Sequence, residues 1–156
     1  MKAALFLTSI LLLSSPAPKV DLSVYKDAYP FDEIGGYPFF DNPAVKTAID
    51  SVAGAGISDW LGDLGVGLPI ELQDDGLIAI VCEQHNCPGN NAAVAIAVSG
   101  ALIAACLYSE DGDAGAPPSK LRWVGPHLDK QIDNKNDKGC PQDAGQFLDA
   151  YSRVLK

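Results

Sequence analysis

The first regular pattern along the chain is a helical spacing of apolar residues. It begins at Asn42-Pro43, a favoured cap residue followed by proline at the first helical position, and Gly54 and Gly56 end it. The apolar positions that recur three and four residues apart in between are Val45, Ala48, Ile49 and Val52. This spacing predicts an amphipathic helix. A short helical turn at 58–61, with Trp60 packed inward, is expected to follow.

From Val66 onward the pattern changes to short apolar runs separated by turn residues. Five such runs are candidate strands, at 66–72, 77–81, 92–98, 102–108 and 120–124. Asp74-Asp75-Gly76 and Ser99-Gly100-Ala101 are tight-turn signals between neighbouring runs. Because parallel strands need longer crossovers, these short connections predict an antiparallel sheet.

The remaining segments complete the predicted fold. Residues 20–41 are expected to form an irregular arm packed on the domain, whereas 110–119 and 125–141 are polar and should have little regular structure. A closing amphipathic helix is predicted by apolar residues at helical spacing, namely Phe147, Leu148, Tyr151, Val154 and Leu155. We therefore predict an α+β domain, with a central antiparallel sheet of about five strands and helices packed on one side. Trp60 and Trp123 are interpreted as core residues.

The beginning of the chain has the features of an export signal. Lys2 precedes an apolar run at 3–13, and Ser14, Ser15 and Ala17 are small residues typical of a cleavage region. The run is shorter than the roughly 20 apolar residues that a membrane span needs. We therefore expect a signal peptide over about residues 1–19, a single domain over 20–156, no membrane span, and a periplasmic or secreted protein.

Composition and charge narrow the choice of partners. Hydrophobic residues make up 47% of the 156 residues, which is enough for one packed core. The formal net charge of −9 argues against a nucleic-acid partner, because phosphate binding needs a basic surface. The same charge favours encounter with a cationic partner, although it also serves solubility alone.

The sequence carries no grouping of residues typical of an enzyme. It has no nucleophile–base or paired-carboxylate constellation, no glycine-rich phosphate loop and no G-x-S-x-G element. Asp111-Gly112-Asp113 lacks the long ligand pattern of a calcium loop, and His127 follows Pro126 in a predicted loop. We expect no enzyme, no catalytic residue and no cofactor.

Four cysteines are the most informative residues of the chain. In an exported protein an even number of cysteines indicates disulfides. Cys106 lies in an apolar run and Cys140 in the polar segment before the last helix. These two either form a second disulfide or leave Cys106 as a buried thiol. Cys82 and Cys87 bracket four residues between two predicted strands, and His85 is one of them.

The segment between Cys82 and Cys87 has three interpretations. The first is a structural disulfide with an incidental histidine. The second is a zinc site formed by Cys82, His85 and Cys87, which needs a fourth ligand that no nearby cluster supplies. The third is a binding loop with His85 at its tip, closed by a disulfide so that it loses less entropy on docking.

This loop resembles that of the inhibitors of vertebrate lysozyme, the Ivy family, whose members carry C-x-x-H-x-C between two strands. The present loop reads Cys82-Glu83-Gln84-His85-Asn86-Cys87. The resemblance extends over residues 43–125 and includes the upstream helix and tryptophan turn, the two apolar strands after the loop, and Lys120-Leu121-Arg122-Trp123. It implies that Cys82 and Cys87 are bridged. It also implies that the loop enters the active-site cleft of lysozyme, where His85 contacts the catalytic carboxylates.

The resemblance also sets the expected contacts and partners. Glu83, Gln84, His85 and Asn86 are the expected partner-binding residues, and a cationic lysozyme is the expected partner. Glu83 stands where lysine is frequent in the family and Gln84 where proline is frequent, so a bacterial lytic transglycosylase is an alternative target. A non-inhibitory envelope-interaction domain of the same fold is the rival function. No metal ion is expected, and a homodimer stays open.

Overall fold

The computed structural model describes residues 20–135 and 138–156, so the predicted signal peptide lies outside the described residues. Within them the chain forms two 3-10 turns, three α-helices and seven strands. In chain order these are η1 (Ser23–Tyr25), η2 (Phe39–Asp41), α1 (Pro43–Ala53), α2 (Ile57–Asp63), β1 (Gly65–Gly67), β2 (Glu71–Gln73), β3 (Gly76–Glu83), β4 (Asn90–Ala97), β5 (Leu102–Ser109), β6 (Lys120–Gly125), β7 (Leu128–Asp133) and α3 (Ala144–Val154).

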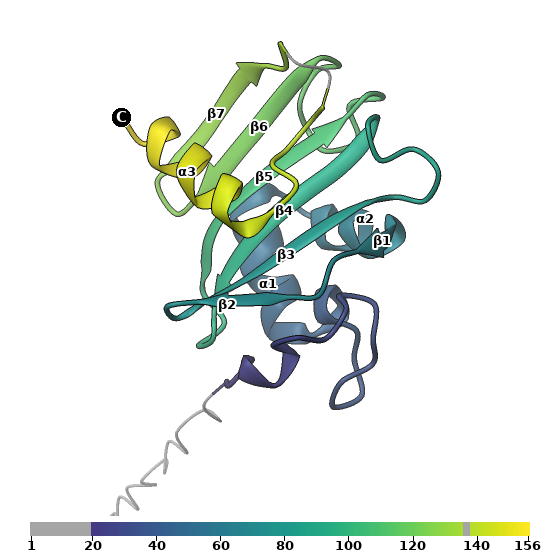
Figure 1. Cartoon of the computed structure of the whole chain (residues 1–156), viewed down its shortest axis with the longest axis vertical. Coiled ribbons are helices and arrows are strands. Elements are labelled where there is room, and N and C mark those ends of the chain that lie inside the picture. The colour runs from purple at the N-terminus through teal and green to yellow at the C-terminus, as the bar shows by residue number, and fades with distance from the viewer. Residues whose placement is uncertain (1–19, 136–137) are drawn as a thin grey trace, which may run out of the picture.

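The strands form one antiparallel sheet, seen in Figure 1. Its order is β1-β3-β4-β5-β6-β7, and β2 pairs with β3 beside β1. The turn between β4 and β5 is closed by Gly100, whose N–H donates to Ala97 O at 2.7 Å. The α+β class and the antiparallel sheet are therefore confirmed.

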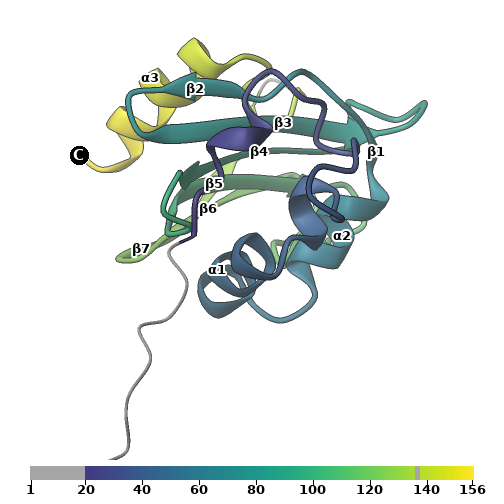
Figure 2. The same cartoon turned by 90° about the horizontal axis from the view of Figure 1, so that it is seen from below.

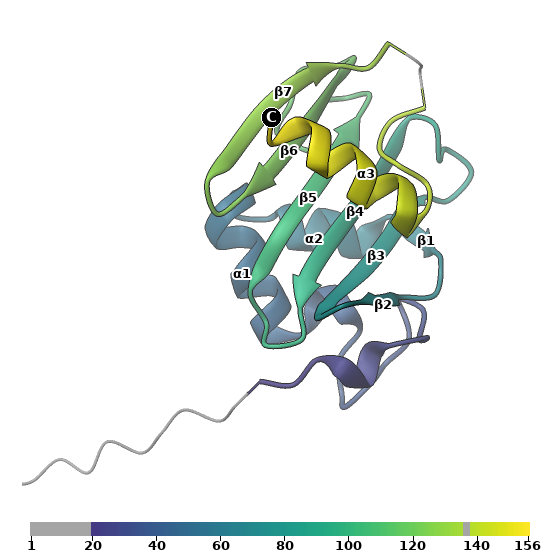
Figure 3. The ribbon, with the colours of Figure 1, turned by 60° about the vertical axis from the view of Figure 1, so that its left-hand side comes forward.

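The helices cover both faces of this sheet, whereas one face was predicted. Figure 2 shows the sheet between α3 on one side and α1 and α2 on the other, and Figure 3 shows α3 crossing in front of the strands. The cause lies in the central strands. Every residue from Gly76 to Val81 of β3 is buried. Because successive side chains of a strand point to opposite faces, both faces of the sheet are apolar and need cover.

Helix α1 begins and ends where the sequence indicates. The side chain of Asn42 accepts a hydrogen bond from Ala44 N–H at 3.0 Å, and Pro43 is the first helical residue. Gly54 follows the helix with a φ of +113°, a conformation that residues with a β-carbon rarely adopt. These cap residues fix the register with which α1 lies on the sheet.

The first face of the sheet packs against α1, α2 and the N-terminal arm. Leu77, Ala79 and Val81 of β3 contribute to this part of the core, together with Val45 and Ile49 of α1. The arm adds four side chains that are at most 2% exposed: Leu22, Tyr25, Phe39 and Phe40. This confirms that residues 20–41 pack on the domain as an irregular arm.

The second face is covered by α3 through aromatic rings. The ring of Phe147 lies 5.5 Å from that of Trp123 and 6.3 Å from that of Tyr151, measured between centroids. Trp123 and Phe147 are at most 2% exposed, so Trp123 is confirmed as a core residue. Helix α3 is capped by Asp143, whose side chain accepts from Gln146 N–H at 2.8 Å.

Two parts of the sheet differ from the predicted strands. The run at 66–72 forms β1 and β2 as separate strands, because Pro69 has no N–H and Ile70 bonds to the arm instead. Ile70 N–H donates to Ala28 O at 2.8 Å, and Ile70 O accepts from Asp27 N–H at 2.9 Å. The second difference is β7, an edge strand in the segment predicted to lack regular structure.

Candidate partner-binding loop

The candidate site is the loop that joins β3 to β4 and projects from the sheet (Figure 1). Strand β3 ends at Glu83 and β4 begins at Asn90, so the loop comprises residues 84–89. At its base Cys82 pairs with Asn91 of β4 on one side and with Val66 of β1 on the other. The loop therefore extends from a base of three paired strands.

A disulfide between Cys82 and Cys87 closes this loop, with a Cα–Cα distance of 4.7 Å. The predicted bridge is thereby confirmed. It contradicts the zinc interpretation, because a zinc site would need both sulfurs as thiolate ligands. Among the described residues, no group of three or more histidine, cysteine or acidic side chains is placed to hold a metal ion.

His85 lies in the outer part of the loop, and it is exposed. Its φ of +68° lies in the left-handed region, which is uncommon for residues other than glycine. Asn86 N–H donates to Glu83 O at 3.0 Å, and the N–H of Gln84, which is also exposed, donates to Leu64 O at 2.9 Å. These bonds close a tight turn around the two exposed side chains and tie it to the residue after α2.

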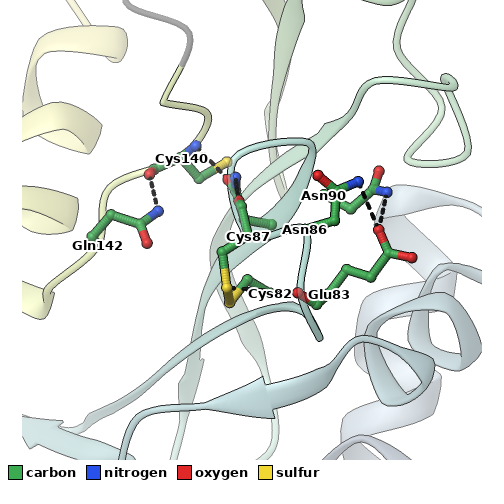
Figure 4. The surroundings of a disulfide bond; sticks show 8 residues. Cys82, Glu83, Asn86, Cys87, Asn90, Cys140 and Gln142 are labelled. Atoms are coloured by element: carbon green, nitrogen blue, oxygen red, sulfur yellow. Dashed lines mark hydrogen bonds between the residues drawn. A yellow bond between two sulfur atoms is a disulfide. The ribbon is translucent and has the colours of Figure 1, made fainter.

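The carboxylate of Glu83 is held inside the loop by two side-chain amides, as Figure 4 shows. Its Oε2 atom accepts from Asn90 Nδ2 at 2.6 Å and from Asn86 Nδ2 at 3.0 Å. The hydrogen bond from Asn90, followed by that from Asn86, lowers the pKa of Glu83 below its ordinary value, because both favour the charged form. The hydrogen bonds of Glu83 therefore link the end of β3 to Asn86 in the loop and to Asn90 at the start of β4.

A second carboxylate ties the loop to the end of β5. Asn86 Nδ2 also donates to Glu110 Oε1 at 2.7 Å, and Glu110 N–H donates to Gly89 O at 2.8 Å. Asn86 thus bridges two acidic side chains, Glu83 at the end of β3 and Glu110 directly after β5. The loop is restrained by side-chain contacts as well as by its disulfide.

The base of the loop is linked to the second disulfide by one buried side chain. Asn91 is fully buried; its Nδ2 donates to Cys87 O at 2.6 Å and its Oδ1 accepts from Cys140 N–H at 2.7 Å. Cys140 is bonded to Cys106 of β5, with a Cα–Cα distance of 5.7 Å, which confirms the second disulfide. The loop is therefore braced against both β5 and the segment that leads into α3.

The structure divides the four expected contact residues into two pairs. Gln84 and His85 are exposed, whereas Glu83 and Asn86 are half-buried and bonded to other parts of the loop. Sequence reasoning missed the supporting residues Asn90, Asn91 and Glu110. The available signal was the pair of polar amides, Asn90-Asn91, at the start of an otherwise apolar strand.

The other candidates from the sequence lie outside this arrangement. His127 is exposed in the turn between β6 and β7, and Asp111 and Asp113 are exposed in the loop after β5. In the described part of the chain, no helix has both the length and the apolar character needed to cross a bilayer.

The fold and the site define a class of protein: a disulfide-bridged α+β domain with a short, internally bonded loop whose outer side chains are exposed. A family model described as inhibitor of vertebrate lysozyme (Ivy) matches residues 44–150, and the chain belongs to this family. The match includes the whole loop, runs from the second residue of α1 through β7, and extends into α3. Comparisons with curated proteins and with solved structures gave no match.

Proposed function

We propose that this protein inhibits lysozyme outside the cytoplasm by inserting the loop between Cys82 and Cys87 into the active-site cleft, with His85 as the leading side chain. The observation that carries the proposal is the exposed His85 on a disulfide-closed, internally bonded loop. Membership of a family of lysozyme inhibitors supports it independently.

The chemistry of the target explains why a histidine suits this position. Lysozyme keeps one catalytic carboxyl protonated as the general acid and the other ionised. A neutral imidazole donates a hydrogen bond from one ring nitrogen and accepts one at the other, so it can bond to both groups at once. While His85 occupies that space, the sugar that would be cleaved cannot enter.

The restraints on the loop support tight binding. A flexible loop would lose conformational freedom on entering a cleft, and that loss would weaken the complex. Here the disulfide, the Glu83 carboxylate and the buried Asn91 hold the loop before any partner arrives. The bonds to Glu83 also place its negative charge between two amides, which reduces repulsion of an acidic cleft.

An extracytoplasmic location suits the covalent structure. All four cysteines are paired in disulfides, which persist in oxidising compartments such as the periplasm and are rare in the cytosol. The apolar run at 3–13 would direct export.

The test is an inhibition assay with the mature protein and its His85→Ala variant against lysozymes of several types. We expect the variant to weaken inhibition by about 100-fold, as for the loss of a central interface residue worth about 3 kcal/mol. His127→Ala is the matched control, since it removes the chain's other histidine from an exposed turn. Full inhibition by His85→Ala would contradict the proposed mechanism.

The same assay should include a bacterial lytic transglycosylase, which cleaves the same glycan with an acidic residue. Inhibition of that enzyme alone would reassign the target while retaining the loop mechanism. If the wild-type protein inhibits neither class of enzyme, the proposed function is wrong and a non-inhibitory envelope role is favoured.

A further inference from the structure

A groove of about 580 Å³ lies between α3 and the outer strands β6 and β7. Its apolar lining includes Leu121, Trp123 and Ile132. Polar groups from the segment before α3 and from the helix itself line the rest, including Gln142 and Gln146. The volume falls within the range of about 300–1,000 Å³ typical of ligand-binding pockets.

The charge of this groove is opposite to that of the whole chain. The chain carries 20 acidic residues and only 11 lysines and arginines. Among the described residues, four of those cations line the groove, Lys130, Lys135, Lys138 and Arg153, and Asp133 is the one acidic residue of the lining. An otherwise acidic molecule therefore has a local cationic groove.

The cations differ in how far their charges are already compensated. The carboxylate of Asp133 is paired with Lys120, which lies outside the lining, and Arg153 approaches Asp149 at 3.9 Å. Within residues 20–135 and 138–156, Lys135 and Lys138 form no direct ion pair, although Lys135 acts on the Asp133 carboxylate at longer range. Two lysines of the groove are thus available to an anionic ligand.

Asn134 contributes a buried amide to the wall of the groove. It lines the groove and is 9% exposed, and its buried Nδ2 has no hydrogen-bond partner among the described residues. A buried donor without a partner is destabilising and rare in native proteins. Because Nδ2 is itself buried, a ligand oxygen in the groove would satisfy this donor only after the Asn134 side chain turns toward the groove.

We propose that the groove binds a short acidic peptide. Its carboxylates would bond to Lys135, Lys138 and Asn134 Nδ2, and its apolar side chains would pack on Leu121 and Ile132. A peptide fits better than an isolated inorganic anion, because the groove combines separated cations with apolar surface. This site is distinct from the exposed His85, although Lys138 and Gln142 also line a smaller hollow at Cys87 and Pro88, at the foot of the loop.

The probe is a fluorescein-labelled hexapeptide of alternating glutamate and leucine, with its glutamine–leucine counterpart as the uncharged control. Fluorescence anisotropy at low salt measures binding to the mature protein, and tryptophan emission of a Trp60→Phe variant, which retains one tryptophan, reports on Trp123. We expect the glutamate peptide to bind about tenfold more tightly than the control, since two exposed ion pairs each contribute a factor of a few to the affinity. Equal binding of both peptides would overturn the proposal.

Variants place the binding in the groove. Lys135→Gln/Lys138→Gln should weaken binding of the glutamate peptide about fivefold, whereas Lys26→Gln/Lys46→Gln, with the same change in charge, should not. Asn134→Asp should also weaken binding, because it replaces the unpartnered donor with a carboxylate oxygen. Thermal melts verify that each variant is folded. If the Lys135/Lys138 variant binds the peptide as tightly as the unaltered protein, the groove is not the binding site. If the protein binds anionic lipid vesicles through these lysines but does not bind the peptide, the ligand is not an acidic peptide.

Discussion

The side chain of Glu83 acts within the loop rather than on its surface. Its carboxylate joins Asn86 near the tip to Asn90 at the start of β4. Glu83 and the disulfide therefore restrain overlapping parts of the loop, the first through charge-assisted hydrogen bonds and the second through covalent closure. This gives a physical role to a residue that stands where the family often has lysine.

Acidification should loosen the loop through this carboxylate. The pKa of Glu83 is lowered in the folded protein, so its contribution to stability is present above the ordinary glutamate pKa of about 4.3 and is lost as the pH falls through the lowered value. We expect Glu83→Gln to bind lysozyme about two- to fivefold more weakly at neutral pH, because an uncharged acceptor forms weaker bonds.

NMR signals of the Asn86 and Asn90 side-chain amides would follow the titration directly. Both should shift with the protonation of Glu83, below about pH 4.3. In Glu83→Gln the Asn90 signal should be insensitive to pH, whereas the Asn86 amide retains its bond to the Glu110 carboxylate. The control is Glu33→Gln, which changes an exposed glutamate of the N-terminal arm. An Asn90 amide signal that titrates only above the ordinary glutamate pKa would contradict this assignment.

The elements of the fold differ in how much their sequences reveal. Strands β3, β4 and β5 follow from apolar runs between clear turn signals, and α1 follows from its spacing and caps. Strand β7 could not be recognised, because only Leu128 and Ile132 of its residues are partly buried and Lys130 interrupts their alternation. Pairing with β6 makes it a strand, and that pairing is a tertiary contact.

Tertiary contacts that the sequence does not reveal also determine the structure of the loop and the placement of the helices. The cysteines and His85 could be identified from their spacing and from the family resemblance. The inward position of Glu83 could not, since it depends on hydrogen bonds from Asn90 of β4 and from Asn86, which is itself held by Glu110 after β5. Nor does the sequence of α3 show which face of the sheet it covers, because the central strands are apolar on both.

The two disulfides should separate stability from binding. In the chain-entropy model, loss of Cys106–Cys140, which spans 34 residues, should lower the free energy of unfolding by about 4 kcal/mol. Loss of Cys82–Cys87, which spans 5, should lower it by about 2 kcal/mol. Paired cysteine-to-alanine variants, unfolded in urea, measure both values.

The two disulfides should rank in the opposite order in their effect on lysozyme inhibition. Where both variants are folded, the one without Cys82–Cys87 should lose most of its affinity for lysozyme, because its loop must be ordered on binding. The one without Cys106–Cys140 should retain most of it. Equal loss of affinity in the two variants would show that the small ring has no special part in binding.

At the scale of the whole molecule, the net charge of −9 should govern the rate of encounter with a cationic lysozyme. Raising the salt concentration from about 0.1 M to about 1 M shortens the Debye length from about 10 Å to about 3 Å. We expect the association rate constant to fall about tenfold, with a smaller change in the dissociation rate constant. Stopped-flow fluorescence separates the two, and an association rate indifferent to salt would rule out electrostatic steering.

The N-terminal arm is part of the folded domain, so it limits how far the chain can be shortened from its N-terminus. The family match starts at residue 44, yet Leu22 N–H donates to Val98 O at 2.8 Å, and the rings of Tyr25, Phe39 and Phe40 are at most 1% exposed. A recombinant chain trimmed to the matched region would lack three aromatic rings from its interior. Protein engineering on this scaffold should therefore retain the arm, even where similarity to relatives stops.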